Sequence, residues 1–363
     1  MGIQEKIRQL EEEIRRTQYN KATEFHIGRL KAKIAKLKRE LISPSHTKTG
    51  KAAGGFDIKK GGDATVAIIG LPSVGKSTLL TELTNAQSKV AAYAFTTLKC
   101  IPGMLEYNGA RIQVLDLPGI IEGAKDGRGR GREIISVARS ADLLLILLDA
   151  TNPDREYETI MRELYGFGIR VNTKPPEIAV KKTLHGGITI SSTVKLTKIS
   201  ETEVNAVLGE YGIYSADVVF RSDASIDELI DVLEGNRVYL PAIIAINKID
   251  LVGGRLDKKL QFEYIPISAE NGVNIELLKE RIYRKLDFIR VYTKKRGEKV
   301  DMEEPLIVRR GTKVSDVCER LHRELKSNFK YALVWGKSVK HPGQRVGLEH
   351  VLADGDVIQI VKR

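Results

Sequence analysis

Eight residues near position 70 have the types and spacing of a loop that binds phosphate groups. The segment from Gly70 to Ser77 fits the pattern Gly-x-x-x-x-Gly-Lys-Ser/Thr, and it lies between an apolar run and a helical pattern that opens at Thr78. Glycines let backbone amides approach phosphates, and the helix start directs further N–H groups and the positive end of its dipole at them. The Lys76 ammonium would reach the β- and γ-phosphates, and the Ser77 hydroxyl would bind Mg²⁺. This context favours a nucleoside triphosphate site over a chance match in a glycine-rich loop.

A second motif, Asp116-Leu117-Pro118-Gly119, follows another apolar run. A carboxylate at the end of that strand can hold the metal through a water molecule, and the Gly119 amide can contact the γ-phosphate and so respond to its presence. Many buried strands end in Asp-x-x-Gly, so the motif alone is weak evidence. Its position after the phosphate-binding loop makes it specific.

The run from Asn247 to Asp250 predicts which base is bound. The Asp250 carboxylate can accept hydrogen bonds from both the N1–H and the N2 amino group of guanine, whereas adenine offers no such pair of donors. Adenine would leave that carboxylate buried without a partner, and a good bidentate base contact is worth roughly 1–3 kcal/mol. Lys248 would lie along the base, and Asn247 would brace the phosphate-binding loop. The backbone at Ser268-Ala269 would contact the guanine O6.

A threonine that joins the metal only in the presence of the γ-phosphate would complete the site. Thr96 and Thr97 lie between the phosphate-binding loop and Asp116, where such a segment belongs. Residue chemistry does not choose between the two, and a pair of threonines on the solvent side of a strand is the alternative. The predicted nucleotide-binding residues are Gly70, Leu71, Pro72, Ser73, Val74, Gly75, Lys76, Ser77, Thr78, Phe95, Thr96, Thr97, Asp116, Leu117, Pro118, Gly119, Asn247, Lys248, Asp250, Ser268 and Ala269.

Short apolar runs separated by helical stretches would position these motifs. Five runs are too apolar for strands with one solvent face, which indicates a mostly parallel sheet covered on both faces. The runs are Thr65–Ile69, Ile112–Leu115, Leu143–Leu148, Ile243–Ile246 and Tyr264–Ile267. This is the doubly wound α/β class. The predicted nucleotide-binding domain covers residues 61–165 and 241–288.

Two further segments precede and interrupt this domain. Residues 1–60 predict a helical hairpin and a glycine-rich linker, because apolar residues recur at helical spacing in two stretches. Residues 166–240 make the connection between the third and fourth strands far longer than a usual crossover, so we predict an inserted α+β subdomain. Its expected strands are 177–183 and 187–196, and its expected helices are 201–208 and 226–233.

Residues 289–363 predict a compact C-terminal α+β domain. Four short strands, 288–292, 306–308, 332–335 and 357–361, surround one helix expected at Val314–Leu325. The segment is long enough for a small core of its own.

The net charge of +12 is concentrated at the two ends of the 363-residue chain. Residues 1–60 carry 15 Lys/Arg against 7 Asp/Glu, and residues 289–363 carry 17 against 10. Basic ends suggest a polyanionic partner such as RNA, since neutralising phosphates releases counterions. Two lysine-rich, soluble surfaces without a ligand are the alternative.

Other classes of protein are disfavoured. Cys100 and Cys318 have no metal-ligand spacing and predict buried thiols rather than a disulfide or zinc site. The longest strongly apolar run, Leu143–Leu148, is about a third of the roughly 20 residues that a membrane span needs, and no leader pattern opens the chain. We therefore expect a soluble, cytoplasmic protein without membrane association.

Three runs together resemble one family of GTPases. The loop Gly70–Ser77 and the runs Tyr93–Leu98 and Asp116–Ala124 are similar to the Obg-related translational GTPases. The continuation Lys125–Arg132 resembles the developmentally regulated GTP-binding proteins in particular. The resemblance covers nearly the whole chain. It implies an N-terminal helical pair, a GTPase domain, an insertion similar to the second domain of ribosomal protein S5, and a C-terminal TGS domain of β-grasp type.

The resemblance also implies the metal ligands and GTP hydrolysis. By analogy with the family, Thr97 rather than Thr96 would bind Mg²⁺, together with Ser77 and, through water, Asp116. Ile120 stands where Ras-like enzymes place the glutamine that orients the attacking water. The catalytic group is therefore unassigned, with Lys76 and Thr97 the best candidates for supporting the transition state. Hydrolysis should be slow unless another group or an activating partner protein positions the water.

Two further features bear on hydrolysis. Potassium is a second candidate cofactor, because some related GTPases hold K⁺ with an asparagine in the phosphate-binding loop; Ser73 occupies that position and puts the route in doubt. The arginines at 128, 130 and 132 are candidates for an internal arginine finger, although Gly-Arg repeats more often contact RNA or remain solvated.

The sequence thus predicts a magnesium-dependent switch that binds and hydrolyses GTP. The γ-phosphate would order the segments around Thr97 and Gly119, and hydrolysis would release them. The resemblance implies action on the ribosome or on ribosomal or transfer RNA, and the basic ends agree with that. One alternative is an RNA-binding scaffold that holds GTP without using it. A second is a small-molecule phosphotransferase, which has no need of the guanine-selective run at Asn247–Asp250.

Overall fold

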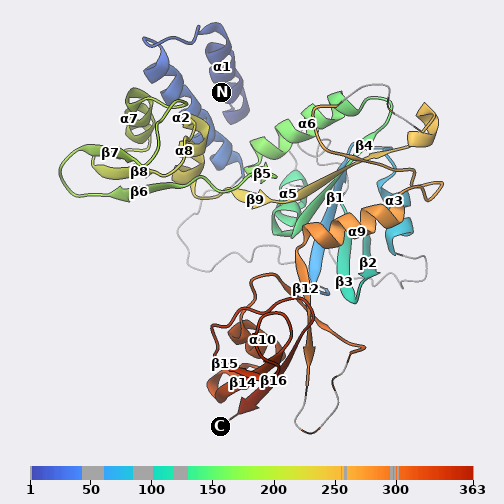
Figure 1. The fold of residues 1–363 in the computed structure, drawn as a ribbon. Coiled ribbons are helices and arrows are strands. Elements are labelled where there is room, and N and C mark those ends of the chain that lie inside the picture. The colour runs from blue at the N-terminus through green and yellow to red at the C-terminus, as the bar shows by residue number, and fades with distance from the viewer. Residues whose placement is uncertain are drawn as a thin grey trace. The chain divides into compact units, whose positions relative to one another are not determined.

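The computed structural model describes residues 2–42, 61–84, 101–117, 130–254, 256, 260–294, 297, 300 and 302–362. The chain divides into two compact units (Figure 1). The first comprises Met1–Gly55 and Glu158–Leu240, and the second comprises Phe56–Tyr157 and Pro241–Arg363. Within the described ranges, no helix is both long and apolar enough to cross a membrane.

A six-stranded sheet forms the centre of the second unit. Its order is β11-β10-β4-β1-β3-β2, and all neighbours are parallel except the antiparallel pair β2 and β3. The strands are β1 (Ala64–Gly70), β2 (Ile101–Tyr107), β3 (Ala110–Asp116), β4 (Leu143–Asp149), β10 (Ala242–Asn247) and β11 (Ile265–Pro266). Each of the five apolar runs overlaps one strand. The edge strand β2, which contains Glu106, was not predicted.

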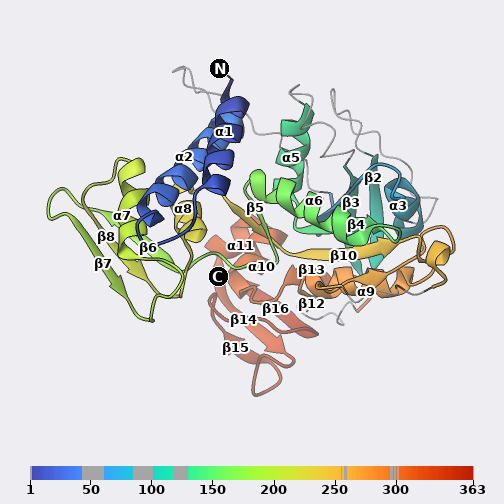
Figure 2. The same ribbon diagram turned by 90° about the horizontal axis from the view of Figure 1, so that it is seen from above.

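Helices cover both faces of this sheet. They are α3 (Lys76–Thr84), α5 (Arg130–Ser140), α9 (Ile275–Lys285) and the first part of α6 (Pro153–Gly166). Val66 and Ile68 of β1 pack into one apolar core with residues of α3 and α9. The alternate residues Ala67 and Ile69 are equally buried and face the other side, where α5 lies (Figure 2). The doubly wound α/β class is therefore confirmed.

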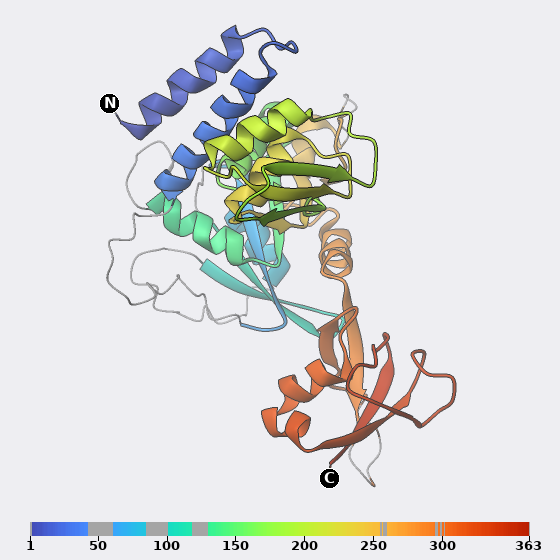
Figure 3. The same ribbon diagram turned by 90° about the vertical axis from the view of Figure 1, so that its left-hand side faces the viewer.

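The first unit combines the N-terminal helices with the inserted segment. Helix α1 (Ile3–Arg16) lies beside α2 (Glu24–Ile42), as Figure 3 shows. A three-stranded sheet of order β6-β8-β7 and two helices follow. These are β6 (Ile178–Lys182), β7 (Ile188–Ser192), α7 (Glu201–Glu210), β8 (Ala216–Phe220) and α8 (Ile226–Glu234). Ala32 and Ala35 of α2 share one core with α7, α8 and β8.

Local sequence signals explain where the inserted helices begin. Ser200 and Glu203 form a capping box at α7, and Ser225 and Glu228 form another at α8. Each serine hydroxyl accepts from the third backbone N–H of its helix, and each glutamate accepts from the serine N–H, so two otherwise unpaired donors are satisfied. A short parallel pair, β5 (Ile169–Val171) and β9 (Val238–Leu240), joins the two ends of the inserted segment.

The C-terminal domain belongs to the second unit and contains a five-stranded sheet of order β13-β12-β16-β14-β15. Its elements are β12 (Phe288–Thr293), β13 (Leu306–Arg309), α10 (Val314–Leu321), α11 (Arg323–Ser327), β14 (Phe329–Trp335), β15 (Gln344–Val346) and β16 (Asp356–Lys362). The helix predicted at Val314–Leu325 is divided at His322, whose φ of −169° is extended and whose ring Nδ1 accepts from the Glu324 N–H at 3.3 Å. That hydrogen bond caps the start of α11, so α10 ends at Leu321.

Apolar and charged contacts join this domain to the six-stranded sheet. Phe288 and Ile307 belong to the same core as β1 and α9. The Arg309 and Arg320 guanidiniums contact Asp142 and Asp63, each at 2.5 Å. The C-terminal domain therefore packs against the six-stranded sheet within one compact unit.

Candidate nucleotide-binding site

The phosphate-binding loop runs from the end of β1 into α3, and its two outer glycines cannot be replaced without strain. A Cβ at Gly70 would lie 2.6 Å from the Leu147 carbonyl oxygen. Gly75 has φ of +92°, and a Cβ there would lie 2.5 Å from Asn247 Nδ2. Ser73 also adopts the left-handed conformation, with φ of +63°. The backbone of the loop is thus held in a conformation that requires residues with little or no side chain at its ends.

The lysine of the loop folds back over it. Lys76 Nζ donates to the carbonyl oxygens of Gly70 at 3.2 Å and Leu71 at 2.9 Å. Pro72, Ser73 and Thr78 are exposed, whereas Val74 is buried and anchors the loop in the core. The ammonium therefore lies against carbonyl oxygens at the start of the loop.

A serine and an aspartate meet where the metal ion was predicted. Ser77 Oγ donates to Asp116 Oδ2 at 2.8 Å, and β1 and β3 bring the two together because Ile68 pairs with Asp116 in the sheet. The other carboxylate oxygen, Asp116 Oδ1, is buried and has no hydrogen-bond partner in the described part of the chain. Hydroxyl and carboxylate oxygens are the ligands that Mg²⁺ prefers, so the pair and its unsatisfied oxygen fit that ion.

Asn247 connects the base-binding run to the phosphate-binding loop. The side chain is buried, its Nδ2 donates to the Val74 carbonyl oxygen at 2.8 Å, and its Oδ1 accepts from the Ala269 N–H at 2.9 Å. One amide thus joins three loops that follow three different strands. The bracing contact predicted for Asn247 is present in this geometry.

Lys248 lies at the start of the short 3-10 helix Ile249–Val252 and forms an ion pair that the sequence analysis missed. Its φ of +64° is left-handed, and its Nζ donates to Asp149 Oδ2 at 2.8 Å. Burial alone would raise the pKa of Asp149, but hydrogen bonds from Lys248 and Thr151 outweigh it and hold that pKa below its usual value. Asp149 therefore fixes the lysine stem in place.

Glu156 supports Asp149 from the first turn of α6. Its Oε2 accepts from the Asp149 N–H at 2.9 Å, and burial raises the pKa of Glu156. One signal for Asp149 was available, because it ends an apolar strand just as Asp116 and Asn247 do. No sequence pattern singles out Glu156.

The base-binding end of the site is only partly buried. Asp250 is exposed on the 3-10 helix, whereas Ser268 and Ala269 are buried after β11. The Ala269 N–H already donates to Asn247, so a contact from it to a base oxygen would be a shared hydrogen bond. Leu117 is fully buried, and its N–H donates to the Ile68 carbonyl oxygen at 3.3 Å.

Several predicted site residues lie outside the described ranges. These are Phe95, Thr96, Thr97, Pro118, Gly119 and Ile120, together with Arg128. The side chains of Arg130 and Arg132 are likewise outside the description. In the ranges that are described, no three His, Cys, Asp or Glu side chains gather as a metal site.

Comparison with known proteins places this site in a family. Residues 65–182 match the family described as 50S ribosome-binding GTPase, residues 185–288 match its C-terminal region, and residues 289–362 match the TGS domain. An uncharacterized GTP-binding protein of Methanocaldococcus jannaschii is 54% identical over 99% of this chain and 93% of its own length. Developmentally-regulated GTP-binding protein 2 of Homo sapiens is 51% identical over the full length of both chains.

Solved structures show only distant likeness. The YchF GTPase of Schizosaccharomyces pombe is 15% identical, with a TM-score of 0.46, over 84% of this chain and all of that chain. The family follows instead from sequence identity over the whole length and from the phosphate-binding and base-binding motifs that the fold brings together. The chain belongs to the developmentally regulated GTP-binding proteins, a family of Obg-related GTPases with a C-terminal TGS domain.

Proposed function

We propose that the protein is a magnesium-dependent GTP-hydrolysing switch that acts on the ribosome or on translation-related RNA in the cytoplasm. The observation that carries the nucleotide part is the double hydrogen bond of Asn247, at 2.8 Å to Val74 and 2.9 Å to Ala269. It couples the loop that would hold the phosphates to the loops that would hold the base. One ligand with both a guanine and a triphosphate would engage all of them.

Each predicted residue has a role that its position supports. Lys76 would turn from its loop carbonyls to the β- and γ-phosphates and neutralise their charge. Asp250 is exposed on the 3-10 helix and would accept from guanine. Asp149 holds Lys248 Nζ, and the Lys248 side chain would lie along the base. Ser77 and Asp116 would hold Mg²⁺, which would neutralise negative charge on the phosphate groups during hydrolysis.

We propose slow intrinsic hydrolysis. Ile120 cannot orient a water molecule as an amide side chain does, so the water must be positioned by another group or by an activating partner. Thr97 and Gly119 would sense the γ-phosphate, as in other switch GTPases. Some related GTPases hold K⁺ with an asparagine in the phosphate-binding loop. Ser73 occupies that position here, so this route to potassium dependence is disfavoured.

The proposed partner rests on charge and family. The matched family is described as 50S ribosome-binding, and both ends of this chain are basic. Lysine and arginine side chains at the ends would neutralise RNA phosphates in a salt-dependent way.

The test compares nucleotides and one substitution at Asp250. Wild-type protein should bind GTP about 10- to 100-fold more tightly than ATP, because a bidentate base contact is worth roughly 1–3 kcal/mol. Asp250→Asn should weaken GTP binding by a similar factor. The variant should instead favour xanthosine triphosphate, whose O2 can accept a hydrogen bond from the new amide. Titration of fluorescent nucleotide analogues measures both. Glu263→Gln, at an exposed acid on the same domain, should change neither affinity.

Turnover and ribosome binding separate a switch from a scaffold. Single-turnover GTP cleavage should fall at least 100-fold in Lys76→Ala, measured with and without ribosomes in sodium and potassium buffers. Equal, negligible rates in both proteins would support the scaffold. Cosedimentation with ribosomes at physiological salt should differ between GTP- and GDP-loaded protein, and identical binding would rule out the switch.

A further inference from the structure

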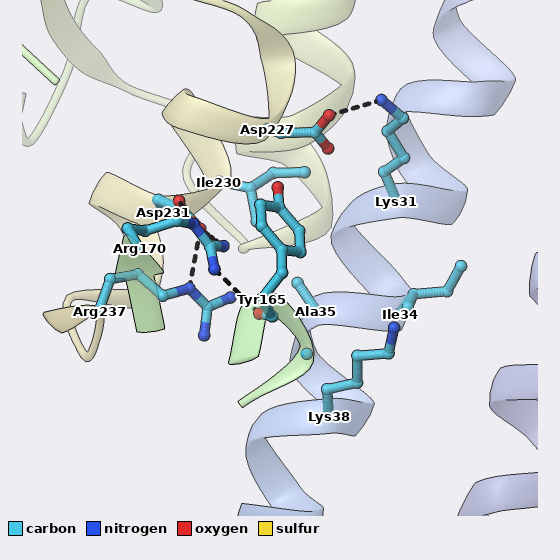
Figure 4. A pocket seen from close by; sticks show the side chains of 11 residues that line it. Lys31, Ile34, Ala35, Lys38, Tyr165, Arg170, Asp227, Ile230, Asp231 and Arg237 are labelled. Carbon is cyan, nitrogen blue, oxygen red and sulfur yellow. Dashed lines mark hydrogen bonds and ion pairs between the residues drawn. The ribbon is translucent and has the colours of Figure 1, made fainter. Parts of the chain in front are cut away.

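A cavity of about 150 Å³ lies within the first unit, bounded by α2, the end of α6, β5 and α8. The side chains that matter for its chemistry are Lys31, Lys38, Tyr165, Arg170, Asp231 and Arg237. Figure 4 shows Arg170 and Arg237 on one side, the two lysines of α2 on the other, and Tyr165 between them. None of these residues belongs to the nucleotide site.

Two buried guanidiniums share one carboxylate at the wall of this cavity. Arg170 pairs with both oxygens of Asp231, each at 2.6 Å, and its guanidinium lies 3.6 Å from the centre of the Tyr165 ring. Arg237 Nε donates to Asp231 Oδ1 at 2.8 Å. The side chains of Arg170, Arg237 and Asp231 are only 8%, 8% and 5% exposed. The trio therefore buries one positive charge that no carboxylate within it balances.

The excess charge resides on Arg237. Arg170 uses all three of its nitrogens, because Nη1 also donates to the Tyr165 carbonyl oxygen at 2.9 Å. Arg237 donates from Nε to Asp231 and from Nη1 to Asn236 at 3.0 Å, and its Nη2 has no further partner in the described part of the chain. An uncompensated buried charge costs several kcal/mol, so a bound anion would offset a real penalty.

The lysines add positive potential but are already paired. Lys31 Nζ contacts Asp227 at 2.9 Å and Lys38 Nζ contacts Glu11 at 2.8 Å, and both lysines are partly exposed. With Glu11 included, the four cations face three carboxylates, Asp227, Asp231 and Glu11. One positive charge, that of Arg237, therefore remains for a bound anion to balance.

We propose that the cavity binds a phosphate group, as free phosphate or as the monoester of a small molecule, with Arg237 as the principal contact. A guanidinium fork matches the oxygens of a tetrahedral oxyanion in geometry and charge. The volume is below the roughly 300–1,000 Å³ of sites for larger organic ligands, yet well above what one water needs. The buried Ile34, Ala35 and Ile230 keep water from one side, which strengthens the attraction.

The test titrates inorganic phosphate into full-length protein saturated with GDP and Mg²⁺, by calorimetry at constant ionic strength in chloride buffer. Wild-type protein should bind phosphate at one site, and Arg237→Met should lower the affinity for phosphate at least tenfold. The variant should fold, since Arg170 still pairs with both Asp231 oxygens. Arg237→Lys keeps the charge without the fork and should recover part of the affinity. Arg221→Met, at an exposed arginine of the same unit, should change nothing.

Three results would overturn the proposal. One is phosphate binding that is unchanged in both Arg237 variants. Another is binding that disappears in Lys76→Ala but persists in Arg237→Met, which would assign the anion to the nucleotide site. The third is binding of a single-stranded RNA lacking a terminal phosphate, weakened in Arg237→Met, with no binding of inorganic phosphate, which would make the cavity an RNA contact.

Discussion

Asn247 is the residue on which the nucleotide site depends most, because it contacts two loops at once. Asn247→Ala would leave the Val74 carbonyl and the Ala269 N–H without their partner in a buried position. Each lost partner costs about 1–3 kcal/mol. We expect the free energy of unfolding to fall by about 2–6 kcal/mol and GDP affinity to fall at least tenfold. Urea unfolding followed by circular dichroism and titration of GDP measure the two effects.

The matched control is Asn271→Ala. Asn271 is exposed, and it contacts Ser268 Oγ, at 3.3 Å, through its backbone N–H. Its side chain therefore braces nothing comparable, and both measurements should stay near wild type. Equal effects of the two substitutions would show that Asn247 contributes only as a generic polar residue.

For single residues, the motifs indicate which side chains belong to the site. They do not indicate the contacts that those side chains make with residues of other strands. The motifs predicted Asn247 as a brace and Ser77 and Asp116 as neighbours, because those residue types follow strands at fixed spacing. The pairing of Lys248 with Asp149 was missed because it depends on β4 and β10 lying side by side. Those strands are far apart in the sequence, and only the sheet order brings their ends together.

Helix α2 depends on a glycine at its contact with the inserted helices. Gly28 is buried, and a Cβ there would lie 3.2 Å from Ile226 Cδ1 and 3.4 Å from Ala206 Cβ. Leucine would have to displace both neighbours, and overpacking of this kind costs about 1–3 kcal/mol. We expect Gly28→Leu to lower the urea midpoint of unfolding, although leucine is the better helix former by about 1 kcal/mol.

Lys33→Leu on the same helix provides the comparison. Lys33 is exposed, so its replacement by leucine adds no atoms to the core and should shift the midpoint very little. A midpoint for Gly28→Leu equal to or above that of wild type would mean that α2 does not pack tightly on α7 and α8.

The elements were predictable where one pattern dominates. The apolar runs of the parallel sheet and the helical spacing of α1 and α2 are such cases. Small residues such as Gly28 and Ala32 indicate that some element approaches α2 closely, but they do not identify α7 and α8 as that element. β8 alternates buried and exposed residues over only five positions, too few for a secure prediction. The break at His322 arises from one side chain that caps α11.

For the second unit, we expect apolar packing rather than ion pairs to hold the C-terminal domain in place. Phe288 is buried and makes a ring contact with Tyr283 at 5.7 Å between ring centres. Phe288→Ala should cost about 3–5 kcal/mol, whereas an exposed ion pair contributes about 0–1 kcal/mol. Limited proteolysis of the C-terminal domain should accelerate in Phe288→Ala. It should change little in the double variant Arg309→Met, Arg320→Met.

Ionic strength offers an independent check of the same point. Salt screens exposed charges but not apolar packing. Raising the salt concentration to about 0.5 M should therefore leave the rate of proteolytic cleavage of wild-type protein nearly constant. A steep rise with salt, matched by the arginine double variant, would show that the contacts to Asp142 and Asp63 carry the association instead.

The strand order also has a consequence for the making of the protein. β4 pairs with β10, yet residues 150–241 are synthesised between them. A growing chain therefore presents the Leu143–Leu148 strand with one open, strongly apolar edge until β10 has left the exit tunnel. Open edges of this kind pair readily with other chains. At that stage, capture of the edge by a chaperone or by a neighbouring nascent chain competes with completion of the fold.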